Sequence, residues 1–346
     1  MRIKNISKNK PNRSKATGVY YDNHGTVAFN LHGDLDLIKN PSETRFQIRQ
    51  IVDYKPSSLV KVRINLAEVN HIESCCILYL VAVIEKLGKN PFVLEVSGSM
   101  PSSLQVRGLL EATGWKDFLK NGIAKERFSD VIAITKNKTN TRLESSLWGK
   151  MSEFALRNIA NPSQNVKDAF YGTLSECVEN VKQHAYGEDY GPWYAMALPE
   201  LGEDPARAVI VDVGMGIPKT IKKTGFDKVM MFISGIGPLG FIWAVVGGGN
   251  DPDLNDDRDC VLLATLGQKT RTDDHERGTG LNGLRELAVD EQCGNFTVMS
   301  GAAMITWKAG DLTPVQKQLT PLPGTIICFD ISASSKLEHD GEVRPE

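Results

Sequence analysis

The sequence is poor in cysteine, and none of its cysteines has the spacing of a metal site. Six cysteines occur in 346 residues, without a CxxC pair. Several lie within apolar runs, where a free thiol behaves as a small hydrophobic side chain. These features argue against structural zinc and against a disulfide framework, so we expect a reducing, cytoplasmic setting. No apolar segment follows the basic N-terminal residues, so a secretory signal is not expected either.

The chain also has little net charge. Its formal net charge is −2, with 24% charged residues, which gives no reason to expect nucleic acid or an anionic membrane as a partner. Residues 1–17 hold six Lys or Arg and no acid, and we expect a flexible basic tail there rather than an anion-binding arm. A second flexible tail is expected at 334–346.

Charge is missing altogether from residues 229–250, "VMMFISGIGPLGFIWAVVGGGN". The length is close to that of a membrane-spanning helix. However, the segment contains several glycines and a proline, and it lies between two glycine motifs that we assign to one site below. We therefore expect a mobile, partly apolar loop and no insertion into a membrane.

The first half of the chain alternates between predicted strands and predicted helices. "TVAFNLHG", "LVKVRINLAEV" and "PFVLEVSG" are typical of strands, and the stretches that follow them are typical of helices. This alternation predicts an α/β layer structure. The lysine-rich "KNKTNTR" at 136–142 indicates a linker, 123–144, between domains at 18–122 and 145–333. At this length, each domain is expected to have its own core.

Three stretches of the first half, "LHGDLDL", "RINLAEVNHIESCCILYL" and "LLEATGW", occur in the order of a known family. Together they resemble the STAS domain, the fold of anti-sigma factor antagonists, over residues 18–122. That family carries a serine at a helix start, which a partner kinase phosphorylates. Here Glu73 takes the acidic position and Ser74 the first serine. Cys75 stands where the phosphorylated serine would be and Cys76 replaces a glycine. The resemblance therefore implies the fold but argues against the usual phospho-switch, while Ser74 remains available as a hydroxyl.

In the second half, residues 163–186 predict a helix with two different edges. Glu176 and Asn180 project from one side, one turn apart, so their side chains are neighbours. Taken alone, this pair favours a solvated polar face. The other edge is an apolar stripe at helical spacing, formed by Phe170, Leu174, Cys177, Val178, Val181 and Ala185.

Two glycine-containing motifs follow the predicted helix. In "AVIVDVGMGIP", an apolar strand runs into Asp212, whose carboxylate can accept a hydrogen bond from an exocyclic amine. The glycines after it allow a sharp turn and the approach of a flat ring, although a plain tight turn explains them equally well. In "ERGTGLNGLRELA", at 276–288, glycines precede a helix start, whose free N–H groups suit phosphate. No GxxxxGK[ST] loop is present, which argues against a P-loop NTPase.

The helix motif and the two glycine motifs, in this order, resemble the GHKL superfamily of ATP-binding domains. This superfamily includes gyrase, MutL and sensor histidine kinases. The resemblance covers 145–333, including the strand "PGTIICFDI", and is closest to the anti-sigma factor serine kinases, where the helix motif commonly ends in His-Ala. It implies an α/β sandwich with a mixed sheet, helices on one face and a lid over ATP.

The resemblance also implies residue roles. Glu176 would polarise the attacking nucleophile as a general base, and Asn180 would ligate Mg²⁺. We interpret His184 as a structural residue, or as one that supports a site residue, rather than as a catalytic one. Asp212 would hydrogen-bond the adenine amino group. The other residues implied to bind ATP are Gly214, Gly216 and Ile217 at the base, Thr325 near it, and Gly278, Thr279, Gly280 and Leu281 around the phosphates.

Residues 218–277 occupy the position of the ATP lid. Lys269 and Arg271 are candidates to approach the γ-phosphate, and the alternative is a solvated polar loop. A lid that closes over nucleotide would couple nucleotide state to shape. Asn282 interrupts a run that often reads GLGL in the family, which predicts a different local phosphate loop.

The sequence leaves three functions open. The leading hypothesis is an ATP-dependent regulatory switch, in which lid closure changes the contacts of the STAS-like module with itself or with a protein partner, and slow hydrolysis resets it. The first alternative is a protein serine/threonine kinase acting on a separate protein, since Cys75 stands at the chain's own acceptor position. The second is a non-hydrolysing interaction module, against which Glu176 argues. A histidine kinase is disfavoured because no helical hairpin with an acceptor His precedes the domain. Whether a homodimer forms stays open.

Overall fold

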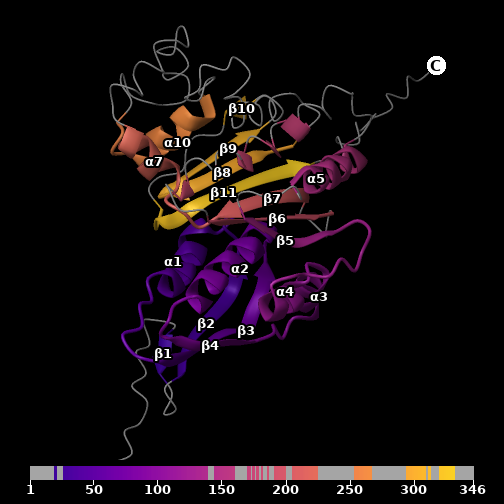
Figure 1. Cartoon of the computed structure of the whole chain (residues 1–346). Coiled ribbons are helices and arrows are strands. Elements are labelled where there is room, and N and C mark those ends of the chain that lie inside the picture. Colours follow the sequence, from indigo (N-terminus) through magenta and orange to yellow (C-terminus); the bar gives the residue numbers. More distant parts are fainter. Residues whose placement is uncertain are drawn as a thin grey trace, which may run out of the picture.

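The computed structural model describes an α/β protein (Figure 1). The described residues are 19–21, 26–138, 144–159, 170–172, 174, 175, 177, 178, 181, 185, 186, 191–199, 205–224, 253–266, 294–308, 311–312 and 319–331. Among them, no helix combines the length and apolar character needed to cross a membrane. The uncharged segment 229–250 lies outside the described residues.

The first half contains a four-stranded sheet in the order β1-β2-β3-β4. Strands β2, β3 and β4 are parallel, and β1 pairs antiparallel with β2. Helices follow these parallel strands, as the alternating sequence predicts. The elements are β1 (Val19–Tyr21), β2 (Thr26–Leu35), α1 (Pro41–Val52), β3 (Val60–Ile72), α2 (Ser74–Gly88), β4 (Val93–Ser99), α3 (Leu104–Ala112) and α4 (Trp115–Asn121).

The second half contains a seven-stranded sheet in the order β10-β9-β8-β11-β7-β6-β5. All its described pairings are antiparallel, so the expectation of a mixed sheet is wrong. The connections β6–β7 and β8–β9 are too short for a parallel crossover, so these two pairs must be antiparallel. The elements are β5 (Ile132–Lys138), α5 (Glu144–Asn158), β6 (Pro192–Leu198), β7 (Ala206–Asp212), α7 (Ile217–Thr224), α10 (Asp257–Leu266), β8 (Phe296–Gly301), β9 (Ala303–Lys308), β10 (Asp311–Leu312) and β11 (Leu322–Ile331).

Strand β5 lies within the stretch 123–144 that the sequence indicated as a linker. It pairs with β6, from Ile132 opposite Ala197 to Lys138 opposite Pro192. The apolar start of β5 is buried, whereas its lysine-rich end gave the stretch its linker-like composition. The second sheet therefore begins before residue 145.

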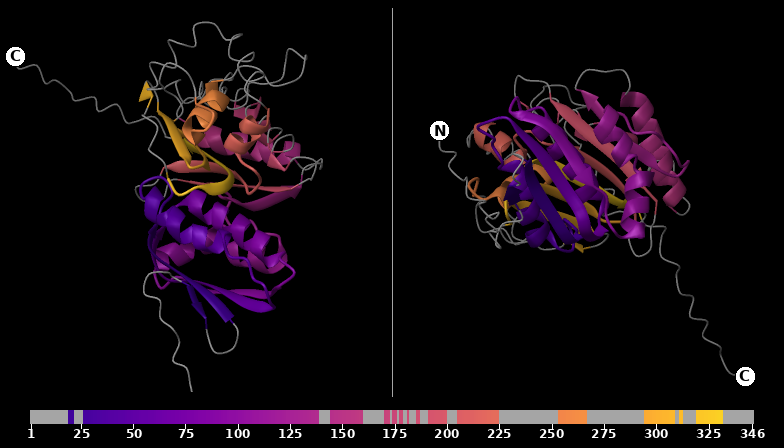
Figure 2. Two further views of the ribbon diagram at one scale, coloured as in Figure 1. Left: turned by 90° about the vertical axis from the view of Figure 1, so that its left-hand side faces the viewer. Right: turned by 90° about the horizontal axis from the view of Figure 1, so that it is seen from below.

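The elements form four layers (Figures 1 and 2). The first sheet forms one outer layer, and α1 and α2 lie between it and the second sheet. Helices α5, α7 and α10 cover the opposite face of the second sheet. Helix α2 packs on β6, β7 and β11, and every side chain from Ser74 to Ile84 is buried. A helix that is apolar all round is suited to such a position between two sheets.

The two halves share a hydrophobic core, which differs from the expected separate core for each half. One cluster of buried side chains runs from the first sheet through α2 to Val209 and Val211 of β7. The alternate residues of β7, Ala208 and Ile210, belong to a second cluster beneath α5 and α10. Because side chains alternate along a strand, β7 contributes to both cores.

Candidate functional site

Three neighbouring strands bring polar side chains together at one end of the second sheet. Asp212 of β7 lies opposite Thr325 of β11, and Thr325 lies opposite Ser300 of β8. The alternation that places Ala208 and Ile210 toward the helices places Asp212 on the same face. By the same alternation, Thr325 and Ser300 share that face with Asp212. We call these three side chains the strand-end site.

Hydrogen bonds hold the strand-end site in place. The Ser300 hydroxyl accepts from the Ile217 amide at 2.9 Å and donates to the Gly324 carbonyl at 2.8 Å. Its oxygen also lies 3.3 Å from the Thr325 hydroxyl. One carboxylate oxygen of Asp212 accepts from the Gly214 amide at 2.8 Å. The site therefore combines one acidic acceptor with two hydroxyl groups on a rigid sheet.

Burial dominates the electrostatics of Asp212. Only 2% of the residue is exposed, and removal from water raises the pKa of its carboxyl from 3.8 to about 6. Hydrogen bonds from Gly214 and Thr325, together with the positive charge of Lys86, oppose this shift. At neutral pH the carboxyl is still mostly ionised, so a buried carboxylate acceptor is present at the strand end.

The turn after Asp212 requires glycine at two positions. A side chain at Gly214 would collide with the carbonyl oxygen of Ala185, and Gly216 has a φ of 81°, in the left-handed region. The Met215 amide donates to the same Ala185 carbonyl at 2.6 Å. The turn is therefore pressed against the end of the segment that carries the helix motif.

The apolar edge predicted for this segment is confirmed. Its described residues from 170 to 178 are helical, and all six members of the stripe are buried in the core beneath the second sheet's helices. The contact at Ala185 brings the helix motif and the Asp212 motif together. Glu176, Asn180 and His184 lie outside the described residues, so their predicted roles stay predictions.

Of the other residues predicted to contact the nucleotide, some are described by the structure and some lie outside the described residues. Ile217 begins α7 beside Ser300, and Thr325 lies beside Asp212, as described above. The phosphate-loop residues and the lid candidates lie outside the described residues; they are Gly278, Thr279, Gly280, Leu281, Asn282, Lys269 and Arg271.

Three residues near the site were not found from the sequence. Ser300 lies in "TVMSGAAMIT", which has no motif, and only the β8–β11 register brings it beside Thr325. Tyr186 follows the helix motif directly, and this position was the one available signal. Its hydroxyl accepts from the Val213 amide at 3.3 Å. Lys86 comes from the first half, and its ammonium group donates to the Val213 carbonyl at 2.8 Å.

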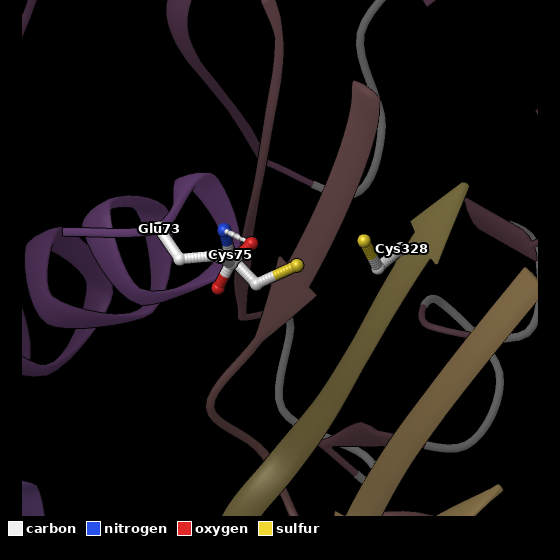
Figure 3. A group of neighbouring side chains, drawn as sticks. All are labelled: Glu73, Cys75 and Cys328. Carbon is white, nitrogen blue, oxygen red and sulfur yellow. Dashed lines mark hydrogen bonds between the residues drawn. The ribbon is translucent and has the colours of Figure 1, made fainter. Parts of the chain in front are cut away.

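A second polar cluster lies at the contact between the halves (Figure 3). The Cys75 and Cys328 sulfurs and a Glu73 carboxylate oxygen lie within 4.8 Å of one another. However, Glu73 already accepts from the Cys75 and Cys76 amides and from Arg207. Burial raises the pKa of both thiols, which opposes the thiolate form that metals need. We therefore interpret the cluster as a helix cap and buried ion pair.

This cluster occupies the position where the STAS-like resemblance implied a phosphoacceptor. Ser74 and Cys75 are buried at the start of α2, and the Ser74 hydroxyl donates to Glu73 at 3.0 Å. The five described cysteines are all free and buried.

No family model matches the chain, and comparison with curated proteins and with solved structures gives no match. The STAS-like and GHKL-like resemblances therefore remain expectations that depend on the quoted motifs.

Proposed function

We propose that this chain is a regulatory protein that binds ATP and Mg²⁺. The observation that carries the proposal is Asp212, a buried acid at the end of β7 whose side chain lies beside those of Thr325 and Ser300. A neutral amide oxygen would accept equally well from the Gly214 amide, so the local turn alone does not require an acid. A carboxylate is the stronger acceptor for an amino group such as that of adenine. Perturbed pKa values are also concentrated at functional sites.

In this proposal the adenine ring lies at the strand-end site. Asp212 accepts a hydrogen bond from the adenine amino group, while the Ser300 and Thr325 hydroxyls offer further polar contacts beside it. Gly214 lets the turn after Asp212 close against Ala185, at the end of the helix motif. The antiparallel sheet supports this arrangement because its register fixes all three side chains relative to one another.

The helix motif would supply the groups that act on the phosphates. Asn180 would hold Mg²⁺ through its amide oxygen, a ligand type that this cation accepts, and the ion would offset phosphate charge. Glu176 would polarise the attacking nucleophile. The contact of Ala185 with Met215 supports assigning this helix and the Asp212 turn to one site.

The switch part of the proposal is supported by the position of the first half. Helices α1 and α2 pack on the face of the second sheet opposite α5, α7 and α10 (Figure 2). Several of their side chains contact residues next to the strand-end site. A change at the nucleotide can thus reach the STAS-like module and, through it, a protein partner. Slow hydrolysis would return the module to its starting state.

Burial of the α2 start bears on the kinase alternative. Ser74 and Cys75 have their side chains between the two halves, where no second active site can reach them without separation of the halves. A kinase activity would therefore act on a separate protein. The experiment with labelled ATP described next tests this alternative as well.

The experiment follows γ-labelled ATP with Mg²⁺ in wild type, Glu176→Ala and Asn180→Ala, with exposed Glu68→Ala as the control. The proposal predicts slow release of free phosphate that is lost in the first two variants and retained in the control. Label transferred to a protein would support the kinase. Nucleotide binding without turnover would support the non-hydrolysing module, and a wild type that binds no ATP would overturn all three.

A further inference from the structure

Polar side chains of α1 and α2 reach the edge of the strand-end site from the opposite face of the sheet. Arg45 and Arg49 of α1, and Tyr79 and Lys86 of α2, all donate to backbone carbonyls of the second half. Each acceptor lies next to a strand end that carries the site. The acceptors are Gly301, Ala303, Thr320, Pro321, Pro323 and Val213.

Lys86 differs from the other three donors because its side chain and that of Asp212 bind the same peptide group. The Val213 carbonyl, which accepts from Lys86 at 2.8 Å, and the Gly214 amide, which donates to Asp212 at 2.8 Å, are the two ends of one peptide group. The Val213 amide is in turn bound to the Tyr186 hydroxyl. Hydrogen bonds at both ends of a peptide group polarise and strengthen each other.

We propose that Lys86 is a positioning residue for nucleotide binding: from the first half of the chain, it fixes the Val213–Gly214 peptide whose amide binds the Asp212 carboxylate. This inference rests on the proposed function. It assigns to the STAS-like module a direct part in building the adenine site, because Lys86 reaches Val213 only while α2 is packed on the second sheet.

The charged and titratable groups around Asp212 come from several elements. Lys86 and Tyr79 face it from α2, and Tyr186 faces it from the end of the helix motif. Burial raises the pKa of both tyrosines well above the usual range, so both hydroxyls are neutral at physiological pH. Lys219 of α7 and the pair Arg45 and Arg49 act one step further out, on Lys86 and on Tyr79.

Coupling of this kind works in both directions. If docking of α2 strengthens nucleotide binding through Lys86, then nucleotide must strengthen docking of α2 by the same factor. Nucleotide release would then loosen the contact between the halves, which gives the switch a physical route.

The test is calorimetric titration with ADP between pH 5.5 and 8. The variants are Lys86→Met, which removes both the charge and the hydrogen bond, and Lys86→Gln, which removes the charge but keeps a donor. Lys86→Arg keeps the positive charge. Two variants are controls. Tyr79→Phe removes the neutral hydrogen bond from α2 to the Pro323 carbonyl, and Lys61→Met removes an exposed lysine of β3. Protonation of ADP itself is the same in every experiment. The readout is therefore the difference in the pH midpoint of ADP affinity between the proteins.

Wild type should lose affinity as the pH falls through about 6. In Lys86→Met and Lys86→Gln we expect the midpoint to move upward by roughly half to one unit, which at pH 6.5 is about a 1.5- to threefold loss of affinity. Lys86→Arg, Tyr79→Phe and Lys61→Met should keep the wild-type midpoint. An unchanged midpoint in both Lys86→Met and Lys86→Gln would overturn the role of Lys86 and leave the proposed function standing. A wild type that does not bind ADP would overturn both.

Discussion

At the residue scale, Asp212 has opposite effects on stability and on binding. Its carboxyl has a pKa of about 6 in the folded chain and an ordinary value of 3.8. Between those values the folded state binds more protons than the unfolded state. The contribution of Asp212 to stability is therefore highest below about pH 4 and is lost as the pH rises through about 6. At neutral pH, the buried charge costs roughly 3 kcal/mol.

Asp212→Asn should therefore stabilise the protein without nucleotide. We expect a gain of up to about 3 kcal/mol in the free energy of unfolding at pH 7, no gain at pH 4, and weaker ATP binding. Urea unfolding at both pH values measures this, with exposed Asp34→Asn as the control. Equal stability of Asp212→Asn and wild type at pH 7 would show that Asp212 is not strained by burial.

The sequence identified the site residues that lie in motifs and missed those that folding alone brings in. Asp212 and Gly214 are adjacent to an apolar strand and were found from that pattern. Thr325 came from the resemblance. Ser300 and Lys86 have no local signal, because a strand register and a helix from the other half place them near Asp212.

At the element scale, α2 depends on a buried ion pair at its first turn. Glu73 caps the helix through the Cys75 and Cys76 amides and also accepts from Arg207 of β7 at 2.7 Å. Arg207 binds Asp330 of β11 as well. These contacts join the helix start to the second sheet, so the ion pair fixes where α2 sits.

Removal of the cation should leave two buried acids without a partner. We expect Arg207→Met to lower the free energy of unfolding by about 3 to 5 kcal/mol, whereas Arg63→Met, on an exposed position of β3, should change it little. Denaturant unfolding followed by circular dichroism measures both. A loss below about 1 kcal/mol for Arg207→Met would contradict the structural role of this pair.

The sequence of α2 also indicates that this helix is covered on all sides. The stretch from Cys75 to Ile84 has no charged residue, and such a helix is covered on all sides. β5 was missed for the opposite reason, since its lysines masked a strand whose first residues are buried.

At the scale of the whole molecule, the two halves are expected to fold as one unit. The face of the second sheet opposite α5 is covered by α1 and α2, and Val209 and Val211 belong to the shared core. Every residue of β7 is buried. A strand buried on both faces has a continuous apolar sequence rather than an alternating one. "AVIVD" has this character, so the sequence did indicate cover on both faces but not which segment provides it.

A shared core predicts cooperative unfolding. We expect a single calorimetric transition for the full chain. A fragment of residues 123–346, which keeps β5, should expose the apolar face of its sheet and aggregate or stay unfolded. Two separate transitions, or a fragment that folds as a stable monomer, would show that the halves are independent.

The measurement that most directly tests the central claim compares ATP with inosine triphosphate, which carries an oxygen where adenine has its amino group. Calorimetry on wild type and Asp212→Asn, with Mg²⁺ at pH 7.5, is sufficient. If Asp212 accepts from the amino group, wild type should bind ATP at least about tenfold more tightly than inosine triphosphate, and Asp212→Asn should lose most of that preference. Equal affinity of wild type for the two nucleotides, or no binding of either, would contradict the account.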